Sequence, residues 1–240
     1  MNRKIILKIC CCAFIVGLMF LIGSLISKNI SEGQKQKEEI YDSAIRITTT
    51  EELQEAMNNK VEHCFIYGEL KAVDPITCPE IEGEYAYIQK VTKEYKMHTR
   101  RNTYTDKDGK KHTEKERYWS WDRINSSSSK CTSMSLCGIE FSSEKINLPS
   151  STHIDTIYNG SHIKYEYYGV RSEFTGTAYV NLEDGVMPRY IDFHFNKNID
   201  ETIASLKSNL MIGLFAFWFF WVLLIAALCY GVICLCGYIE

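Results

Sequence analysis

From Leu210 to Ile239 the chain reads LMIGLFAFWFFWVLLIAALCYGVICLCGYI, thirty residues without a charged side chain. A second uncharged run, ICCCAFIVGLMFLIGSLI, extends from Ile9 to Ile26. At about 1.5 Å rise per residue, even the shorter run forms a helix of about 27 Å, close to the thickness of the hydrocarbon core of a bilayer. The two runs therefore predict two transmembrane helices, one at each end of an integral membrane protein.

The basic cluster Arg3, Lys4 and Lys8 precedes the first run and has two interpretations. It could be the start of a cleaved signal peptide, but no A-x-A-like cleavage site follows the run, which favours an uncleaved anchor. By the positive-inside rule, the same cluster favours cytoplasmic termini, although three lysines soon after the run act in the opposite direction. We therefore expect the segment between the runs to be extracytoplasmic at the cell membrane.

The predicted fold class is a membrane α protein with an all-β loop domain. Two terminal transmembrane helices flank an antiparallel β sheet or barrel that begins with a short helix. The expected divisions are a transmembrane helix (1–27), a tether (28–47), a β-rich extramembrane domain (48–197) and a helix that runs into the second span (198–240).

The short helix is predicted at Thr49, because Glu52 lies three residues after a hydroxyl N-cap and completes a capping box. From Val61 onward the apolar residues alternate with period two, which is typical of strands. Pro75 and Pro79 are expected to bracket a turn, and the Asp-Gly pair at Gly109 predicts a hairpin turn. The expected strands are near 61–70, 85–105, 112–122, 131–141, 152–158, 162–170, 173–182 and 189–195, with a loop at 126–129.

The cysteines between the apolar runs are Cys64, Cys78, Cys131 and Cys137. They form no C-x-x-C pair, so buried thiols or one or two structural disulfides are expected, and four cysteines leave three pairings open. The six histidines are scattered. A metal shared by His98, His112 and Glu114 across the hairpin is a minor alternative to ordinary strand surface, and we predict no metal or cofactor.

Charge is concentrated in one hairpin. The chain between the apolar runs carries 24 Lys and Arg against 29 Asp and Glu, yet residues 90–117 carry ten Lys and Arg against five Asp and Glu. This basic arm could bind lipid phosphates or another anionic surface, or it could be a solvated hairpin whose lysines prevent edge pairing. The candidate contact residues are Lys107, Lys110, Lys111, Trp119 and Trp121. The two tryptophans are expected on one face of the strand, either in the core or in an interface.

The stretch GELKAVDPITCPEIEGEYAYIQKVTKEY (Gly68–Tyr95) resembles the opening of the GIDE-type domain, a β-rich module between two membrane spans. The similar features include Gly68, the two prolines, Gly83 and Tyr85, followed later by the W-x-W element of Trp119 and Trp121. The GIDE-type domain occurs in mitochondrial ubiquitin ligases, in which a RING finger accompanies it. No RING finger follows the second apolar run here, so the resemblance implies no ligase activity. The whole chain is also similar to two-span membrane proteins of Gram-positive bacteria, with HTRR to YWSWD as their shared segment.

Two functions are consistent with these patterns. The first is a membrane-anchored β-domain that acts as a binding or scaffold module at the cell envelope, with the bilayer, an envelope protein or an anionic surface as partner, and no nucleic acid. The alternative is a membrane-tethered enzyme with dispersed, thiol-dependent catalytic residues. The sequence contains no G-x-S-x-G, Walker loop, dinucleotide fingerprint or HExxH, which favours binding and predicts no catalytic residue.

Overall fold

The computed structural model describes residues 3–182 and 184–238, and the side chains of Arg3, Lys4 and Lys8 lie outside the described part. The chain divides into two compact units. One contains Met1–Arg46 and Asn198–Glu240, and the other contains Ile47–Lys197.

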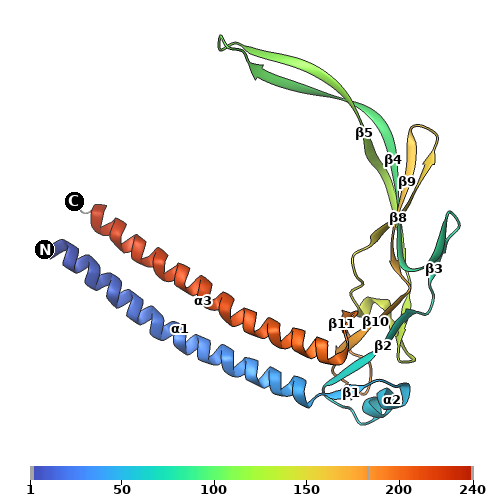
Figure 1. Ribbon diagram of the computed structural model, residues 1–240, viewed down its shortest axis with the longest axis horizontal. Helices are drawn as coiled ribbons and strands as arrows, with labels where there is room; N and C mark the ends of the chain where they lie inside the picture. The colour runs from blue at the N-terminus through green and yellow to red at the C-terminus, as the bar shows by residue number, and fades with distance from the viewer. Residues whose placement is uncertain (1–2, 183, 239–240) are drawn as a thin grey trace. The chain divides into compact units, whose positions relative to one another are not determined.

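The first unit is built from the two long apolar helices, α1 (Arg3–Ser43) and α3 (Ile199–Tyr238) (Figure 1). Both are long and apolar enough to cross a membrane. They pack antiparallel, because the Trp221 indole N–H donates to the Met19 carbonyl at 2.9 Å while Lys207 Nζ lies 2.7 Å from an Asp42 carboxylate oxygen. The segment predicted as a tether is therefore helical as far as Ser43.

Gly23 permits a close contact between the two helices. A Cβ atom at this position would lie 2.4 Å from Trp221 Nε1. Without that Cβ, the indole ring can reach the backbone carbonyl of Met19, which lies one turn earlier in α1. One turn along α3, the Trp218 indole N–H donates to Ser27 Oγ at 3.1 Å. Both tryptophans therefore connect α3 to α1, a role that the sequence did not indicate.

The second unit holds the β-rich region, in which the described strands form two open sheets and no closed barrel. The first sheet has the order β11-β10-β2-β6-β7, with β1 beside β2, and the second has the order β3-β4-β9-β8, with β5 beside β4. The strands are β1 (Ile45–Ile47), β2 (Cys64–Ala72), β3 (Ile76–Cys78), β4 (Ile81–Thr105), β5 (Lys111–Lys130), β6 (Ser133–Leu136), β7 (Ile139–Ser142), β8 (Thr152–Asn159), β9 (Ile163–Arg171), β10 (Glu173–Val180) and β11 (Asp192–Phe195). The pairings within each path are antiparallel.

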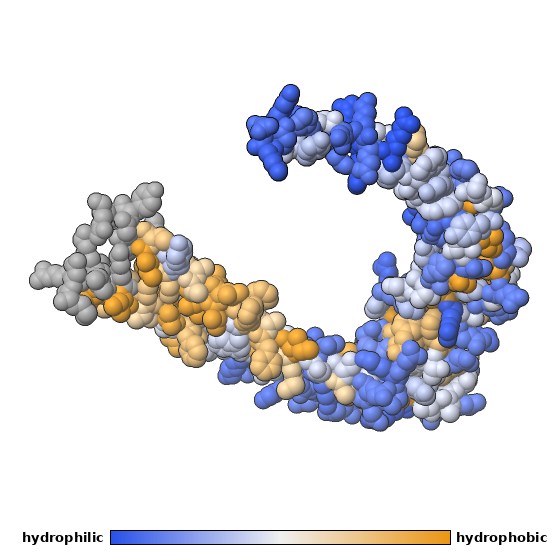
Figure 2. Space-filling model, turned by 45° about the horizontal axis from the view of Figure 1, so that its top comes forward, coloured by the Kyte–Doolittle hydropathy of each residue, from blue (hydrophilic) through white to orange (hydrophobic). Residues whose placement is uncertain are grey.

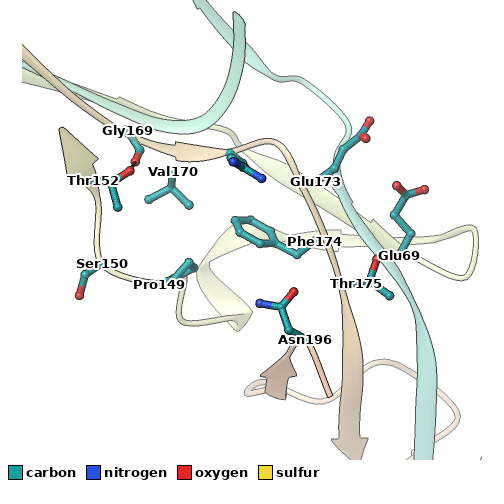
Figure 3. Close-up of a pocket in the computed structure, with 11 residues that line it drawn as sticks. Glu69, Pro149, Ser150, Thr152, Gly169, Val170, Glu173, Phe174, Thr175 and Asn196 are labelled. Atoms are coloured by element: carbon teal, nitrogen blue, oxygen red, sulfur yellow. Dashed lines mark hydrogen bonds between the residues drawn. The ribbon is translucent and has the colours of Figure 1, made fainter. Parts of the chain in front are cut away.

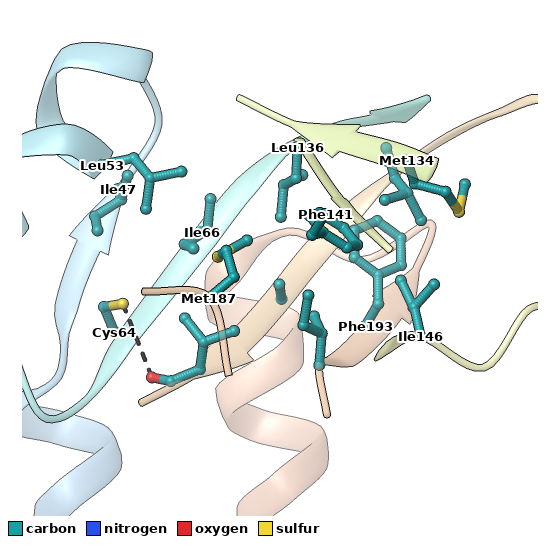
Figure 4. Packing of buried hydrophobic residues seen from close by; sticks show 14 of the residues in the cluster. Ile47, Leu53, Cys64, Ile66, Met134, Leu136, Phe141, Ile146, Met187 and Phe193 are labelled. Carbon is teal, nitrogen blue, oxygen red and sulfur yellow. Dashed lines mark hydrogen bonds between the residues drawn. The ribbon is translucent and has the colours of Figure 1, made fainter. Parts of the chain in front are cut away.

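The short helix α2 (Thr50–Asn58) confirms the predicted capping box. Thr49 Oγ1 accepts the Glu52 N–H, and the Glu52 carboxylate accepts the Thr49 N–H. Leu53 and Ala56 are buried and pack into the core of the first sheet, whose other members include Ile66, Leu136 and Phe193 (Figure 4). A smaller core of Ile81, Ile88 and Tyr167 supports the second sheet.

Three local predictions are wrong. The serines at 126–129 belong to β5, because their backbone pairs with Ile88–Val91 of β4 although serine has little strand preference. The segment between Pro75 and Pro79 forms the short strand β3. The single strand expected at 131–141 is a hairpin, β6–β7, whose two-residue turn has positive φ at both Cys137 (47°) and Gly138 (75°), as a type I′ turn requires.

Candidate functional site

The β4–β5 hairpin extends beyond the rest of its sheet as a two-stranded ribbon (Figure 1). β4 pairs with β9 only as far as Glu94, whereas its pairing with β5 continues to Thr105, which lies opposite Lys111. The stretch from Tyr95 to Thr105 is about 37 Å long at about 3.4 Å per residue. Most of its side chains are exposed, and Figure 2 shows that they are largely hydrophilic.

The register places opposite kinds of charge on the two faces of this ribbon. Pairing proceeds without interruption from Lys93–Arg123 to Thr105–Lys111, so the odd-numbered residues of both strands share one face and the even-numbered residues share the other. We call the odd-numbered residues of 93–105 and 111–123 the basic–aromatic face. Its charged residues are all basic: Lys93, Arg101, Lys111, Lys115, Arg117 and Arg123.

The opposite face, which we call the paired face, consists of the even-numbered residues and contains all the carboxylates of 93–105 and 111–123. Arg100 Nε lies 2.7 Å from Glu116 Oε2, and Lys96 Nζ lies 2.8 Å from Glu94 Oε2. Hydrogen bonds from Arg100, and then from an asparagine amide, lower the pKa of the Glu116 carboxyl. His98 Nε2 also lies 2.7 Å from an Asp122 oxygen. Both Lys and Arg side chains of this face are therefore paired with carboxylates, and the face carries no excess of positive charge.

The basic–aromatic face has no such neutralisation along most of its length. Its one ion pair is at the base of the ribbon, where Lys93 Nζ lies 2.7 Å from Glu166 Oε2. In the part of the chain that the structure describes, its other five basic residues form no ion pair, and all five are exposed. These residues are Arg101, Lys111, Lys115, Arg117 and Arg123. A strip of unpaired basic side chains therefore faces solvent, interrupted by aromatic residues between Arg117 and Arg123.

An aromatic cluster lies at the base of this strip. The Tyr95 ring contacts both Trp119 and Trp121, with centroid separations of 5.2 Å in each case. This contact confirms that the two tryptophans share one face of the strand. Tyr158 of β8 lies edge-on to Trp121 at 6.1 Å. Trp119 is 51% exposed and lies outside both buried cores, so burial of the ring does not explain it.

The same face continues beyond Trp121 into a hollow of about 420 Å³. Its polar lining residues are Gln89, Lys93, Arg123, Glu166 and Tyr168, together with Val91 and Trp121. Glu166 is buried and comes from β9. Burial by itself raises the pKa of this carboxyl, but hydrogen bonds from Lys164, Lys93 and Tyr168 outweigh burial and hold the pKa at about 2. The carboxylate is therefore charged at neutral pH and faces a hollow bordered by a tryptophan and an arginine.

The structure brings together only some of the predicted contact residues. Lys111 shares a face with Trp119 and Trp121, whereas Lys107 and Lys110 belong to the connecting turn, beside Asp106 and Asp108. Asp106 Oδ1 accepts hydrogen bonds from the backbone N–H groups of Asp108 (3.0 Å) and Lys110 (2.9 Å) and orders that turn. The prediction omitted Arg101, Lys115, Arg117 and Arg123, which alternation by residue number could have identified.

The four predicted cysteines are dispersed over the second unit as free thiols. Burial raises the pKa of the Cys64 thiol to about 12, and it also raises the pKa values of Cys131 and Cys137. Burial and a 2.8 Å hydrogen bond to Glu80 raise the pKa of Cys78. A nucleophilic cysteine needs the opposite shift.

The metal alternative at the hairpin is wrong. His98 lies opposite Tyr118 and His112 lies opposite Tyr104, so the two histidines do not face each other. Among the described residues, no group of three or more His, Cys, Asp or Glu side chains could hold a metal ion.

A larger cavity, of about 590 Å³, is lined by residues of both sheets (Figure 3). Phe174 and Asn196 border it, together with one basic residue, Arg171, and two carboxylates, Glu69 and Glu173. Glu173 already forms an ion pair with Lys71. The described residues of its lining include neither cysteine nor histidine, so this cavity offers less chemistry than the ribbon does.

Comparisons with protein-family models, with curated proteins and with solved structures find no match for this chain. The resemblance to the GIDE-type domain therefore remains a prediction from the residues of Gly68–Tyr95.

Proposed function

We propose that the protein is a membrane-anchored binding module that engages an anionic partner through the basic–aromatic face of its β4–β5 ribbon. The single observation that carries this proposal is the separation of charge between the two faces. One face presents five unpaired basic side chains and a half-exposed aromatic cluster, and the other face carries the four carboxylates and two cations that are both ion-paired.

The anchor is the pair of apolar helices. The contacts of Trp218 with Ser27 and of Trp221 with Met19 place the uncharged part of α1 beside the stretch of α3 that begins near Trp218. In this register about 19 residues of each helix, or about 28 Å, would occupy the hydrocarbon core. The rest of α1, from Lys28 to Ser43, would continue as a helical stalk, stabilised by the Lys207–Asp42 pair.

Because the helices are antiparallel, two spans would place both termini on the same side of the membrane. The basic residues before the first apolar run favour the cytoplasm for that side. The β-rich unit is therefore proposed to be extracytoplasmic, at the cell envelope.

A solvated hairpin that avoids edge pairing explains this surface less well. Charged side chains protect an edge strand wherever they stand along it, and on either face. That role does not require all the carboxylates to lie on one face and the unpaired cations to lie on the other. A surface that binds an anionic partner does need this separation, because carboxylates on the same face as the cations would repel the partner.

The test compares two triple variants of the full chain in nanodiscs of zwitterionic lipid. Lys111, Lys115 and Arg117 are replaced by Gln on the basic–aromatic face, while the control replaces Lys96, Arg100 and Lys107 by Gln. Both variants lose the same net charge. The probes are immobilised polyphosphate and polygalacturonate oligomers. Each cation near an anionic surface contributes about 1 kcal/mol, so the first variant is expected to bind roughly a hundredfold more weakly than the wild type.

The control variant is expected to retain most of the binding, and added salt should weaken the binding of both the wild type and the control. Equal losses in the two variants would show that net charge matters and the face does not. Failure of the wild-type chain to bind any anionic probe would also overturn the proposal.

The thiol-dependent enzyme receives no support from a specific feature of the structure. The thiols lie apart from the ribbon and have raised pKa values.

A further inference from the structure

The aromatic cluster adds flat apolar surface to the basic–aromatic face, and binding of charge alone does not require such a surface. Tyr95, Trp119 and Trp121 present adjoining rings beside the cationic strip, and the Tyr95 and Trp119 rings lie within 23° of parallel. Their surfaces are partly open to solvent, and Tyr158 beside them is 63% exposed. Such rings offer flat apolar surface at low cost in conformational entropy, so they suit a ligand that has flat apolar faces of its own.

Sugar rings and nucleobases both have such faces, and the extracytoplasmic position proposed above favours sugar rings. The adjoining hollow contains the Glu166 carboxylate, which pairs with Lys93 and Lys164 and accepts a hydrogen bond from the Tyr168 hydroxyl at 2.9 Å. The Gln89 amide also lines the hollow. A carboxylate and an amide accept hydrogen bonds from the hydroxyl groups of a sugar.

The shape of the face indicates a linear ligand. From Arg123 to Lys111 the strip is about 41 Å long at about 3.4 Å per residue, but it is only two strands wide, or about 5 Å between strand axes. Lys115 lies directly opposite Arg101, and Arg117 is the next residue of the face toward Trp119. The cations therefore recur along one line, as the acidic groups of an extended polymer do.

From these features we propose that the ligand is an extended anionic polysaccharide. Its sugar rings stack on Trp119, Tyr95 and Trp121, its hydroxyl groups bond in the hollow, and its acidic groups pair with the cations of the strip. This inference rests on the proposed function and specifies its partner.

The test uses the full chain in nanodiscs of zwitterionic lipid, with four soluble probes of similar length. They are polygalacturonate oligomers, a neutral galactan, polyphosphate and oligo(dT). The variants are Trp119→Ala and its matched control Tyr118→Ala, an adjacent exposed aromatic residue on the paired face. Circular dichroism and thermal unfolding check that each variant retains its fold.

Polygalacturonate is expected to bind more tightly than the other three probes. Trp119→Ala should weaken that binding about tenfold, the loss expected for a single stacking side chain, while Tyr118→Ala should leave it within about twofold. Polyphosphate binding should be insensitive to both changes.

If polyphosphate binds as tightly as polygalacturonate, or if Trp119→Ala has no effect, the polysaccharide inference is wrong while the proposed anionic binding stands. Tightest binding of oligo(dT) would assign the face to nucleic acid instead. Absence of binding by every anionic probe would overturn both proposals. If Trp119→Ala unfolds the chain, Trp119→Phe, which keeps a smaller ring, is expected to show a partial loss, and no loss would refute stacking.

Discussion

Replacement of Gly23 by alanine tests how the two apolar helices are held together. The new Cβ would lie 2.4 Å from Trp221 Nε1 and 2.8 Å from Trp221 Cδ1, so the indole ring must move away. It then loses its hydrogen bond to the Met19 carbonyl and its packing against α1. Gly17→Ala is the matched control, because a Cβ atom at that position of the same helix meets nothing within 4 Å.

The expected cost follows from these contacts. A hydrogen bond between membrane helices contributes about 0.6 kcal/mol on average and up to about 1.7 kcal/mol. Forcing the indole side chain off its rotamer adds about 0.5 to 1.5 kcal/mol. The gain in helix propensity from glycine to alanine is about 1 kcal/mol and applies at both positions, so it cancels in the comparison. Gly23→Ala should therefore be about 1 to 3 kcal/mol less stable than Gly17→Ala.

The free energy of unfolding can be measured by SDS titration of the full chain in mixed micelles, with fluorescent labels on the two helices to report their separation. A Trp221→Ala background supplies a second control, in which Gly23→Ala should cost no more than Gly17→Ala. Equal stability of the two glycine variants in the wild-type background would show that the close packing of Trp221 against Gly23 does not stabilise the helix pair.

Three further predictions concern the other parts of the chain. The folded pKa of Glu166, about 2, lies below its ordinary value of 4.5, so its contribution to stability is complete above that value and is lost as the pH falls toward 2. Thermal unfolding between about pH 5 and about pH 3 should therefore show a smaller loss of stability for Glu166→Gln than for the wild type, and equal losses would contradict the assignment. Iodoacetamide at neutral pH should label Cys64 and Cys131 only after denaturation, as followed by mass spectrometry; fast labelling of either thiol in the folded chain would restore the thiol-dependent alternative. Protease added to intact cells that express the chain should cut within Ile47–Lys197 and spare an N-terminal tag, whereas protection of this segment until lysis would reverse the proposed orientation.

The elements that the sequence identified are those with a strong local signal. The uncharged runs, the Thr49 capping box and the Asp-Gly turn at Gly109 each depend on a few neighbouring residues, and the structure has a helix, a cap and a turn at these places. The wrong predictions depend on distant residues instead. The serines at 126–129 form a strand because β4 lies beside them, and nothing in their own side chains indicates it. Cys137 adopts positive φ because the hairpin it closes requires it, although cysteine is not a usual turn residue.

The sequence prediction found only part of the candidate site, because the decisive signal again depends on how the two strands pair. A count of charged residues over 90–117 combines the two faces of the ribbon and its turn into one total. The turn itself carries as many carboxylates as lysines. The count therefore drew attention to Lys107 and Lys110, where charge is locally balanced. The unbalanced charge is in the alternation of KHTEKERYWSWDR, which puts lysine, arginine and tryptophan at odd positions and the acids at even ones.

Reading that alternation requires the correct starting point. Thr92 lies opposite Asn125 and Lys93 lies opposite Arg123, so Ile124 is an extra residue in β5 and forms a β-bulge. Beyond it Ser126 lies opposite Val91, and the even-numbered serines join the face that carries the odd-numbered residues on the other side of the bulge. If the alternation of faces is followed from the Gly109 turn, the tryptophans and the unpaired cations fall on one face, as the structure has them. If it is followed from the serines without allowing for the bulge, the same residues are assigned to the opposite face. Alternation along β4 places Gln89 and Val91 on the same face as Lys93, which lies opposite Arg123, so the cationic strip ends in the hollow beside Glu166.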